Sequence, residues 1–130
     1  MDYTVELDKQ QFDQIEHVLH TELIELGVEN VLLIDLAGNI LVHLDDGRTD
    51  HDIYSLAALA AGNFGAVSAM AKIIGEEDFS LLFHKGEKES IHFTKIASDL
   101  LLVTVFSTEI SLGFVRLKVN EAIKRIRTII

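Results

Sequence analysis

The feature that most constrains this chain is the segment 53–71, in which no residue carries a charge. At about 100° per residue, a helix through this segment gathers one broad apolar face, which we expect to pack on a sheet. That face consists of Ile53, Leu56, Ala57, Ala60, Phe64, Val67 and Ala71. The opposite side consists of Ala58, Gly62, Gly65, Ala66 and Ala69, and one flank holds Leu59, Asn63, Met70 and Ile73.

A helix that is apolar or small on every side is usually buried on every side. Each glycine costs a helix about 1 kcal/mol relative to alanine, so Gly62 and Gly65 favour the close approach of another backbone. Two other readings exist: a membrane span, and a small outer face that water tolerates. The segment is nearly long enough to span a bilayer, but Asn63 and many alanines make it weakly apolar. We therefore predict burial between a sheet and a second protein, and no membrane span.

Length and charge narrow the class of protein. A chain of 130 residues suits one domain, here 1–130. The net charge of −10 repels phosphate backbones, which argues against nucleic acid as the main partner. The chain has no cysteine, and its start lacks the basic and apolar stretches of a signal peptide. We expect a soluble cytoplasmic protein.

Apolar periodicity and turn residues predict an α/β domain. The expected elements are helices at 8–26, 52–74 and 112–129, and strands at 30–34, 40–44, 79–84, 91–96 and 100–106. In the first helix the buried stripe is predicted to be Phe12, Ile15, Leu19, Leu23 and Leu26. Segments 31–34 and 100–103 are apolar at every position, which is typical of central strands covered on both faces.

The predicted strand 79–84 begins a meander and has an open edge. It places Phe79, Leu81 and Phe83 on one face and contains no proline. Open strand edges invite pairing with another chain. Pairing with its own copy would give a symmetric dimer with a continuous sheet.

Motifs of catalysis are missing. The sequence has no phosphate-binding loop, no serine-hydrolase elbow and no dinucleotide fingerprint. We expect no catalytic residue and no cofactor. Arg48 precedes the second helix, where it would act as an arginine finger or, as we favour, lie solvated in its loop.

The six histidines raise the question of a metal site. His17 and His20 share a helix face, and His84 and His92 lie on neighbouring strands. Zinc sites need three or four convergent ligands, and no H-E-x-x-H motif is present. We predict surface histidines and no metal.

The last helix is basic, whereas the rest of the chain is acidic. Cations favour a helix C-terminus, which is the simpler explanation; a docking surface for an acidic partner is the other. The basic residues are Arg116, Lys118, Lys124, Arg125 and Arg127, opposed only by Glu121.

Four segments carry a family resemblance. They are the DLAGN turn at 35–39, the alanine- and glycine-rich helix 56–71 closed by Gly75, the meander with Gly86 and LLVTV at 101–105, and LGFVR at 112–116. With these the chain resembles the Roadblock (dynein light-chain) family over nearly its whole length, and most closely the bacterial gliding-motility type, the MglB-like proteins.

The resemblance implies a five-stranded antiparallel sheet in the order 2-1-5-4-3. The long second helix would lie on one face, and the two terminal helices on the other. Such domains dimerise through the third strand and second helix, and the paired helices bind Ras-like small GTPases. Some members accelerate GTP hydrolysis and others are scaffolds, and the resemblance leaves both roles, and larger assemblies, open.

Carried onto this sequence, the resemblance assigns two surfaces. The dimer candidates are Leu59, Asn63, Met70, Phe79, Leu81 and Phe83. The candidates for GTPase contact are Ala58, Gly62, Gly65, Ala66 and Ala69. The resemblance supplies no arginine finger, so we expect any stimulation of hydrolysis to act by stabilising the GTPase's own switch loops.

A sensor for a small ligand is the alternative function. Domains of the PAS and GAF type share a similar sheet order, but they need a pocket with convergent polar groups. The apolar strands of this chain look filled instead. We therefore favour a homodimeric, non-enzymatic regulator or scaffold for a small GTPase.

Overall fold

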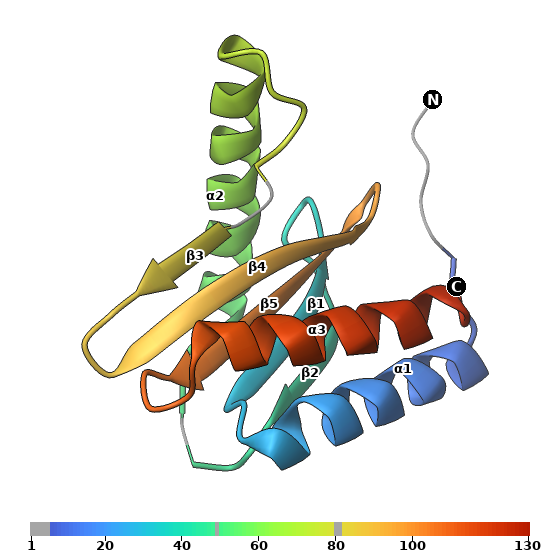
Figure 1. The fold of residues 1–130 in the computed structure, drawn as a ribbon. Helices are drawn as coiled ribbons and strands as arrows, with labels where there is room; N and C mark the ends of the chain where they lie inside the picture. The colour runs from blue at the N-terminus through green and yellow to red at the C-terminus, as the bar shows by residue number, and fades with distance from the viewer. Residues whose placement is uncertain (1–5, 49, 80–81) are drawn as a thin grey trace.

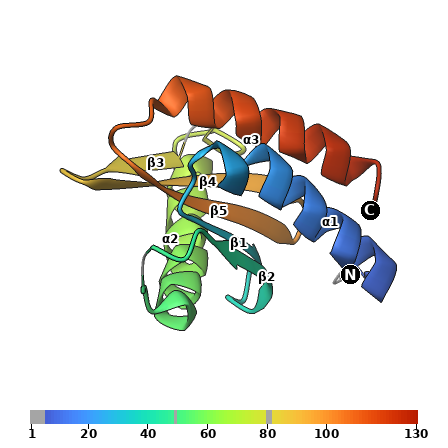
Figure 2. The ribbon, with the colours of Figure 1, turned by 90° about the horizontal axis from the view of Figure 1, so that it is seen from below.

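The computed structural model describes residues 6–48, 50–79 and 82–130, which form three layers (Figure 1). A five-stranded antiparallel sheet in the order β2-β1-β5-β4-β3 is the middle layer. Helices α1 and α3 cover one face of this sheet, and α2 lies against the other (Figure 2). The sheet order and the placement of the helices confirm the expected fold class.

The elements follow the predicted order. Their bounds are α1 (Lys9–Glu22), the short 3₁₀ helix η1 (Ile24–Leu26), β1 (Asn30–Asp35), β2 (Ile40–Asp45), α2 (Ile53–Ile73), β3 (Leu82–Lys85), β4 (Glu89–Ala97), β5 (Leu100–Ser107) and α3 (Leu112–Arg127). Side-chain caps begin the three α-helices, since Asp8, Asp52 and Ser111 each accept a hydrogen bond from a backbone N–H three residues later.

The first helix ends earlier than predicted. After Glu22 the chain tightens into η1, and Gly27, with φ of +106°, ends it. Leu26 belongs to the predicted buried stripe but is 41% exposed, because the change of helix type rotates it away from the sheet. Val18 lies in the buried stripe instead.

The two central strands divide the core into two parts. On the side of α1 and α3, Leu19 and Ile126 pack with Leu102, which is buried in β5. On the other side, Phe64 of α2 packs with Leu32 of β1 in a second cluster, which contains fewer buried residues than the first. β1 and β5 are buried almost throughout, as the prediction of strands covered on both faces requires.

Helix α2 rests on the sheet with only part of its length. Its first half crosses the sheet, and its second half extends beyond the edge formed by β3 (Figure 1). The buried residues are Ala57, Ala60, Ala61, Phe64 and Ala71. By length and composition α2 is apolar enough to cross a membrane, yet only 22% of its most apolar window is buried in the domain. A core helix therefore presents most of its uncharged surface outward.

The turn between β1 and β2 packs against α2. Asp35 accepts hydrogen bonds from the backbone N–H groups of Ala37 and Asn39, at 3.0 and 2.9 Å. Gly38 has φ of +92°, and a Cβ atom added there would lie 3.1 Å from the Cα atom of Ala58 in α2. Gly38 thus satisfies both a left-handed backbone and a close helix contact.

The carboxyl groups of Glu29 and Glu89 lie together at one end of the sheet, where β1 and β4 begin. Glu29, next to β1, is buried beside Glu89 of β4. Burial, a hydrogen bond to Glu89 and repulsion from Glu89 and Asp46 raise the pKa of Glu29 to about 7. Glu29 therefore holds a proton in the folded state at pH values where it would be ionised in the unfolded chain.

A substitution at Gly38 tests the turn contact. Gly38→Ala should lower the free energy of unfolding by about 2–4 kcal/mol, from left-handed strain plus crowding against the α2 backbone. Gly47→Ala is the matched control, because φ there is +79° but a Cβ atom meets nothing within 4 Å. It should cost about 1 kcal/mol from strain alone. Equal losses in urea unfolding would contradict the close contact at Gly38.

The pH dependence of stability tests the carboxyl pair. The pKa of Glu29 is raised from 4.5 to about 7, so its stabilising contribution is present below pH 4.5 and is lost as the pH rises toward 7. The wild type should therefore lose stability relative to Glu29→Gln across this window. Glu89→Gln should remove only the part of the slope that comes from Glu89, because burial of Glu29, the largest cause, remains. Burial and Arg116 lower the pKa of His92 to about 4, so His92 makes the folded state more stable as the pH rises. This effect is the same in the wild type and in both variants, and it cancels when their stabilities are compared. Parallel curves for wild type and both variants would contradict the assignment.

Candidate functional site

The outward side of α2 is lined by small residues. The GTPase candidates Ala58, Gly62, Gly65, Ala66 and Ala69 are all exposed, as the helical wheel predicts. A Cβ atom added at Gly62 or Gly65 would meet nothing within 4 Å. The core therefore does not explain these two glycines, and they leave a smooth surface that another backbone can approach.

One flank of this surface borders a shallow hollow of about 330 Å³. Gly65 and Ala69 lie on its α2 side, and Leu36, from the turn between β1 and β2, lies on the other. Asp78 accepts a hydrogen bond from Ser68 at 2.9 Å and lies 3.9 Å from the ammonium of Lys95. The charges at the hollow thus come from Asp78, Lys95 and, at the end of α2, Lys72, whereas residues 53–71 of the helix carry none.

Leu36 is not among the predicted site residues. It is 40% exposed and comes to α2 only through the packing of its turn. The sequence signal is a leucine in a turn that otherwise consists of Asp, Ala, Gly and Asn. Its neighbours in the hollow come from distant parts of the chain.

The other flank of α2 carries large apolar side chains. Leu59 is 72% exposed, Met70 is 53% exposed and Ile73 is 83% exposed. The side-chain amide of Asn63 lies 3.5 Å from His84 Nε2 of β3, which places this flank toward the open edge strand. The structure therefore brings the dimer candidates Leu59, Asn63 and Met70 to the side of α2 that faces β3.

The predicted face of the edge strand is partly wrong. β3 begins at Leu82, so Phe79 lies before the strand, where it lines a separate hollow with Phe64 and Phe93. Leu81 falls outside the described residues. Phe83 stacks on Phe106 with ring centroids 6.0 Å apart, on the sheet face that α1 and α3 cover. Within the described residues, β3 pairs only with β4, so its outer edge is open.

Arg48 is bound within its own loop. Its Nε and its terminal amino group lie 2.7 and 2.6 Å from Asp46 Oδ2. The side chain is 68% exposed and lies just before the start of α2. This geometry agrees with the reading of a solvated loop arginine.

The histidines do not converge. His84 pairs with Ile91 and His92 pairs with Phe83 in the register of β3 and β4, so the two rings point to opposite faces of the sheet. His20 lies 3.6 Å from Glu25, and His17 is exposed on α1. Among residues 6–48, 50–79 and 82–130, no group of three or more His, Asp or Glu side chains is arranged to hold a metal ion.

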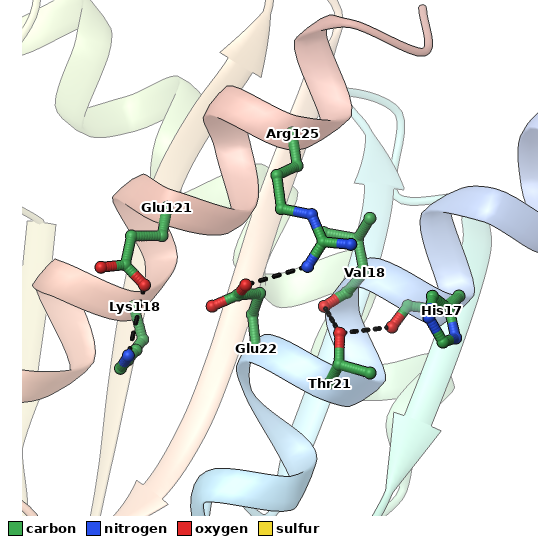
Figure 3. Close-up of polar contacts among 7 residues, drawn as sticks. All are labelled: His17, Val18, Thr21, Glu22, Lys118, Glu121 and Arg125. Atoms are coloured by element: carbon green, nitrogen blue, oxygen red, sulfur yellow. Dashed lines mark hydrogen bonds and ion pairs between the residues drawn. The ribbon is translucent and has the colours of Figure 1, made fainter.

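The basic residues of α3 are partly paired within the chain (Figure 3). Arg125 donates to Glu22 of α1 at 2.9 Å, and Lys118 donates to Glu121 at 3.2 Å. The first of these ion pairs joins α3 to α1, and both reduce the positive charge available to a partner. They favour the structural explanation of the basic helix over a docking surface.

The comparisons with known proteins agree with this architecture. The model of the Roadblock/LC7 domain matches residues 16–106. The chain is similar to the gliding protein MglB of Thermus thermophilus, with 28% identity, a TM-score of 0.86, and coverage of 99% of this chain and 97% of that one. Myxococcus xanthus MglB gives 30% identity, a TM-score of 0.81, and coverage of 98% and 97%.

A further similar structure is described as MglB with a tetrameric arrangement. It is 27% identical, has a TM-score of 0.87, and covers 99% of this chain and 96% of that one. The comparison with curated protein sequences gave no significant match. Because the family model matches well over half of the chain and the MglB structures align along nearly all of it, this chain belongs to the Roadblock/LC7 domain family, in its MglB-like group.

Proposed function

We propose that this protein is a cytoplasmic homodimer that regulates or scaffolds a Ras-like small GTPase, which it binds through α2. The observation that carries the proposal is the uncharged small-residue surface of α2, which is exposed although the helix is nearly as apolar as a core element. The kinship with MglB proteins supports a role as regulator or scaffold.

The surface suits contact with another protein. Gly62 and Gly65 allow a partner backbone or bulky side chain to lie directly on the helix, because no side chain of this protein stands between. Removing this surface from water stabilises a complex by about 25 cal/mol for each Å² of apolar area. Specificity would come from the charged surroundings, where Lys95 and Asp78 lie beside the hollow.

Stimulation of GTP hydrolysis would be indirect. The contact candidates Ala58, Gly62, Gly65, Ala66 and Ala69 carry no group that can stabilise charge on a transferring phosphate. Arg48 is bound to Asp46. The proposed mechanism is therefore a population shift, in which binding favours the hydrolysis-competent arrangement of the GTPase's switch loops.

The homodimer is proposed to form at β3 and the adjoining flank of α2. The open edge of β3 can add a strand, and Leu59 and Met70 are exposed on the same side of the domain. Two copies related by a two-fold axis would then place both α2 helices side by side. A role as a sensor for a small ligand has less support. Packed side chains fill the core on both faces of the sheet, and the hollows described here lie at the surface.

A charge at Gly65 tests the contact surface. Gly65→Glu should raise the dissociation constant for the Ras-like GTPase encoded nearest to this gene by about tenfold or more, because a partner would have to desolvate the new carboxylate. Gly113→Glu is the matched control: Gly113 is also an exposed glycine in a helix with nothing within 4 Å of an added Cβ atom, but it lies in α3 on the other side of the sheet.

Binding by calorimetry and phosphate release should be measured together. Under the population-shift mechanism, Gly65→Glu should lose stimulation where it loses binding and regain it at saturating protein. Both variants should keep the wild-type free energy of unfolding to within about 1 kcal/mol, since glutamate is the better helix former. Equal effects of the two substitutions, or no binding by the wild type, would overturn the proposal.

A further inference from the structure

A hollow of about 290 Å³ lies between the sheet and the start of α3, on the face opposite to α2. Its floor is a row of side chains from three strands, because Ser90 of β4 pairs with Lys85 of β3 and with Phe106 of β5. Paired residues of antiparallel strands point to the same face, and Phe106 belongs to the core under α1 and α3. The wall, formed by the segment that leads into α3, consists of Thr108, Ile110, Ser111 and Leu112.

The hydroxyl group of Ser90 has no partner at the floor of this hollow. The residue is 2% exposed, and its side chain forms no hydrogen bond with any residue that the structure describes. A buried hydroxyl group without a hydrogen bond lowers the stability of a fold, whereas alanine at the same position would not. A serine that lines a hollow in this way indicates a polar group that enters from outside.

The start of α3 adds backbone donors at the wall. Ser111 caps the helix and accepts the N–H groups of Phe114, at 3.1 Å, and Val115, at 3.2 Å. The N–H groups of Leu112 and Gly113 have no acceptor in the described part of the chain, as is usual at a helix start. A Cβ atom at Gly113 would meet nothing within 4 Å, so no side chain covers these donors from that position. The aligned peptide dipoles of a helix favour an anion at this end.

The charges around the hollow suit an anion with a single negative charge. Lys85 contributes one cation, and the first turn of α3 holds no acidic side chain. Glu87 lies close by, since its carbonyl oxygen accepts a hydrogen bond from the hydroxyl of Thr108 at 3.0 Å, and the exposed Glu109 lies between two wall residues. These carboxylates repel a doubly charged phosphate monoester more than a carboxylate.

The rest of the lining is apolar and partly aromatic. Phe83 stacks on Phe106 with ring centroids 6.0 Å apart, and Ile110 and Leu112 line the wall. An apolar cavity of about 150 Å³ is enough to hold benzene, so this hollow has room for one aromatic ring and a carboxylate. Aromatic side chains favour a ring that stacks on them or meets them edge-on.

We propose that this hollow binds a small aromatic carboxylate. The ring lies against Phe83 and Phe106, and the carboxylate accepts hydrogen bonds from the hydroxyl of Ser90 and the first N–H groups of α3, with Lys85 as its counter-ion. The site is separate from the candidate surfaces on α2 and needs no partner protein, so it adds a ligand to the proposed function. The hollow lies outside the packed core, so the fold is complete without the ligand.

An NMR titration of the ¹⁵N-labelled protein with benzoate, at constant ionic strength and pH, tests the site. Benzoate should give saturable shifts at the amides of Ser90, Leu112 and Gly113. Benzamide, which has the same ring but no charge, should bind about tenfold more weakly or worse. Inorganic phosphate should also bind more weakly than benzoate. The proposal is overturned if benzoate gives no saturable shifts at these amides, if benzamide binds equally well, or if phosphate binds more tightly.

Two variants connect the binding to the named side chains. Ser90→Ala should raise the dissociation constant for benzoate by about fivefold or more, and Lys85→Gln by about threefold or more. Lys88→Gln is the matched control, because Lys88 is exposed in the same turn but does not line the hollow, and it should change the constant by less than about twofold.

Urea unfolding of the Ser90→Ala protein separates a ligand contact from a structural role. Because the hydroxyl has no partner within the described chain, the unfolding midpoint should equal or exceed that of the wild type. A lower midpoint would show that the protein itself uses the hydroxyl and would overturn the site. Wild-type affinity for benzoate in a folded Ser90→Ala protein would also overturn it.

Discussion

The packing of α2 on the central strands is the contact on which the rest of the molecule depends. Ala57, Ala60 and Phe64 lie against a sheet face formed by Leu32 and its neighbours. Alanines bring the helix close to the sheet, and the turn at Gly38 fits against its backbone. Only one side of α2, from its start to about Phe64, contacts the sheet. The rest of its uncharged surface and its projecting C-terminal end therefore face away from the core. The candidate surfaces for both partners follow from this geometry.

The fold could be predicted well where local signals are strong. Apolar runs indicated β1 and β5, turn residues and apolar periodicity indicated the three helices, and the helical period separated buried from exposed residues of α2. The errors lie where tertiary structure decides. A 3₁₀ turn rotates Leu26 outward, and Phe79 packs beside Phe64 and Phe93 and is not part of a strand. Leu36 was missed because its contact with α2 joins distant segments.

Stability and recognition are assigned to different glycines. Gly38 serves the fold, since both its φ and its contact with Ala58 disfavour a side chain. Gly62 and Gly65 lie inside α2, and an added Cβ atom would meet nothing within 4 Å at either position. They therefore lower the stability of the helix without improving the packing within one chain. Such a cost is expected where a surface must accept another backbone. The same reasoning applies to the exposed Ile73, which no described residue of its own chain covers.

The central claim is that the exposed apolar flank of α2 and the open edge of β3 form an interface between two copies and are not left in water. Sedimentation velocity of the wild-type protein across micromolar concentrations tests it most directly. The account predicts a species of twice the chain mass of 14.5 kDa, in concentration-dependent exchange with monomer or stable throughout. A single 14.5 kDa species at every concentration would contradict it.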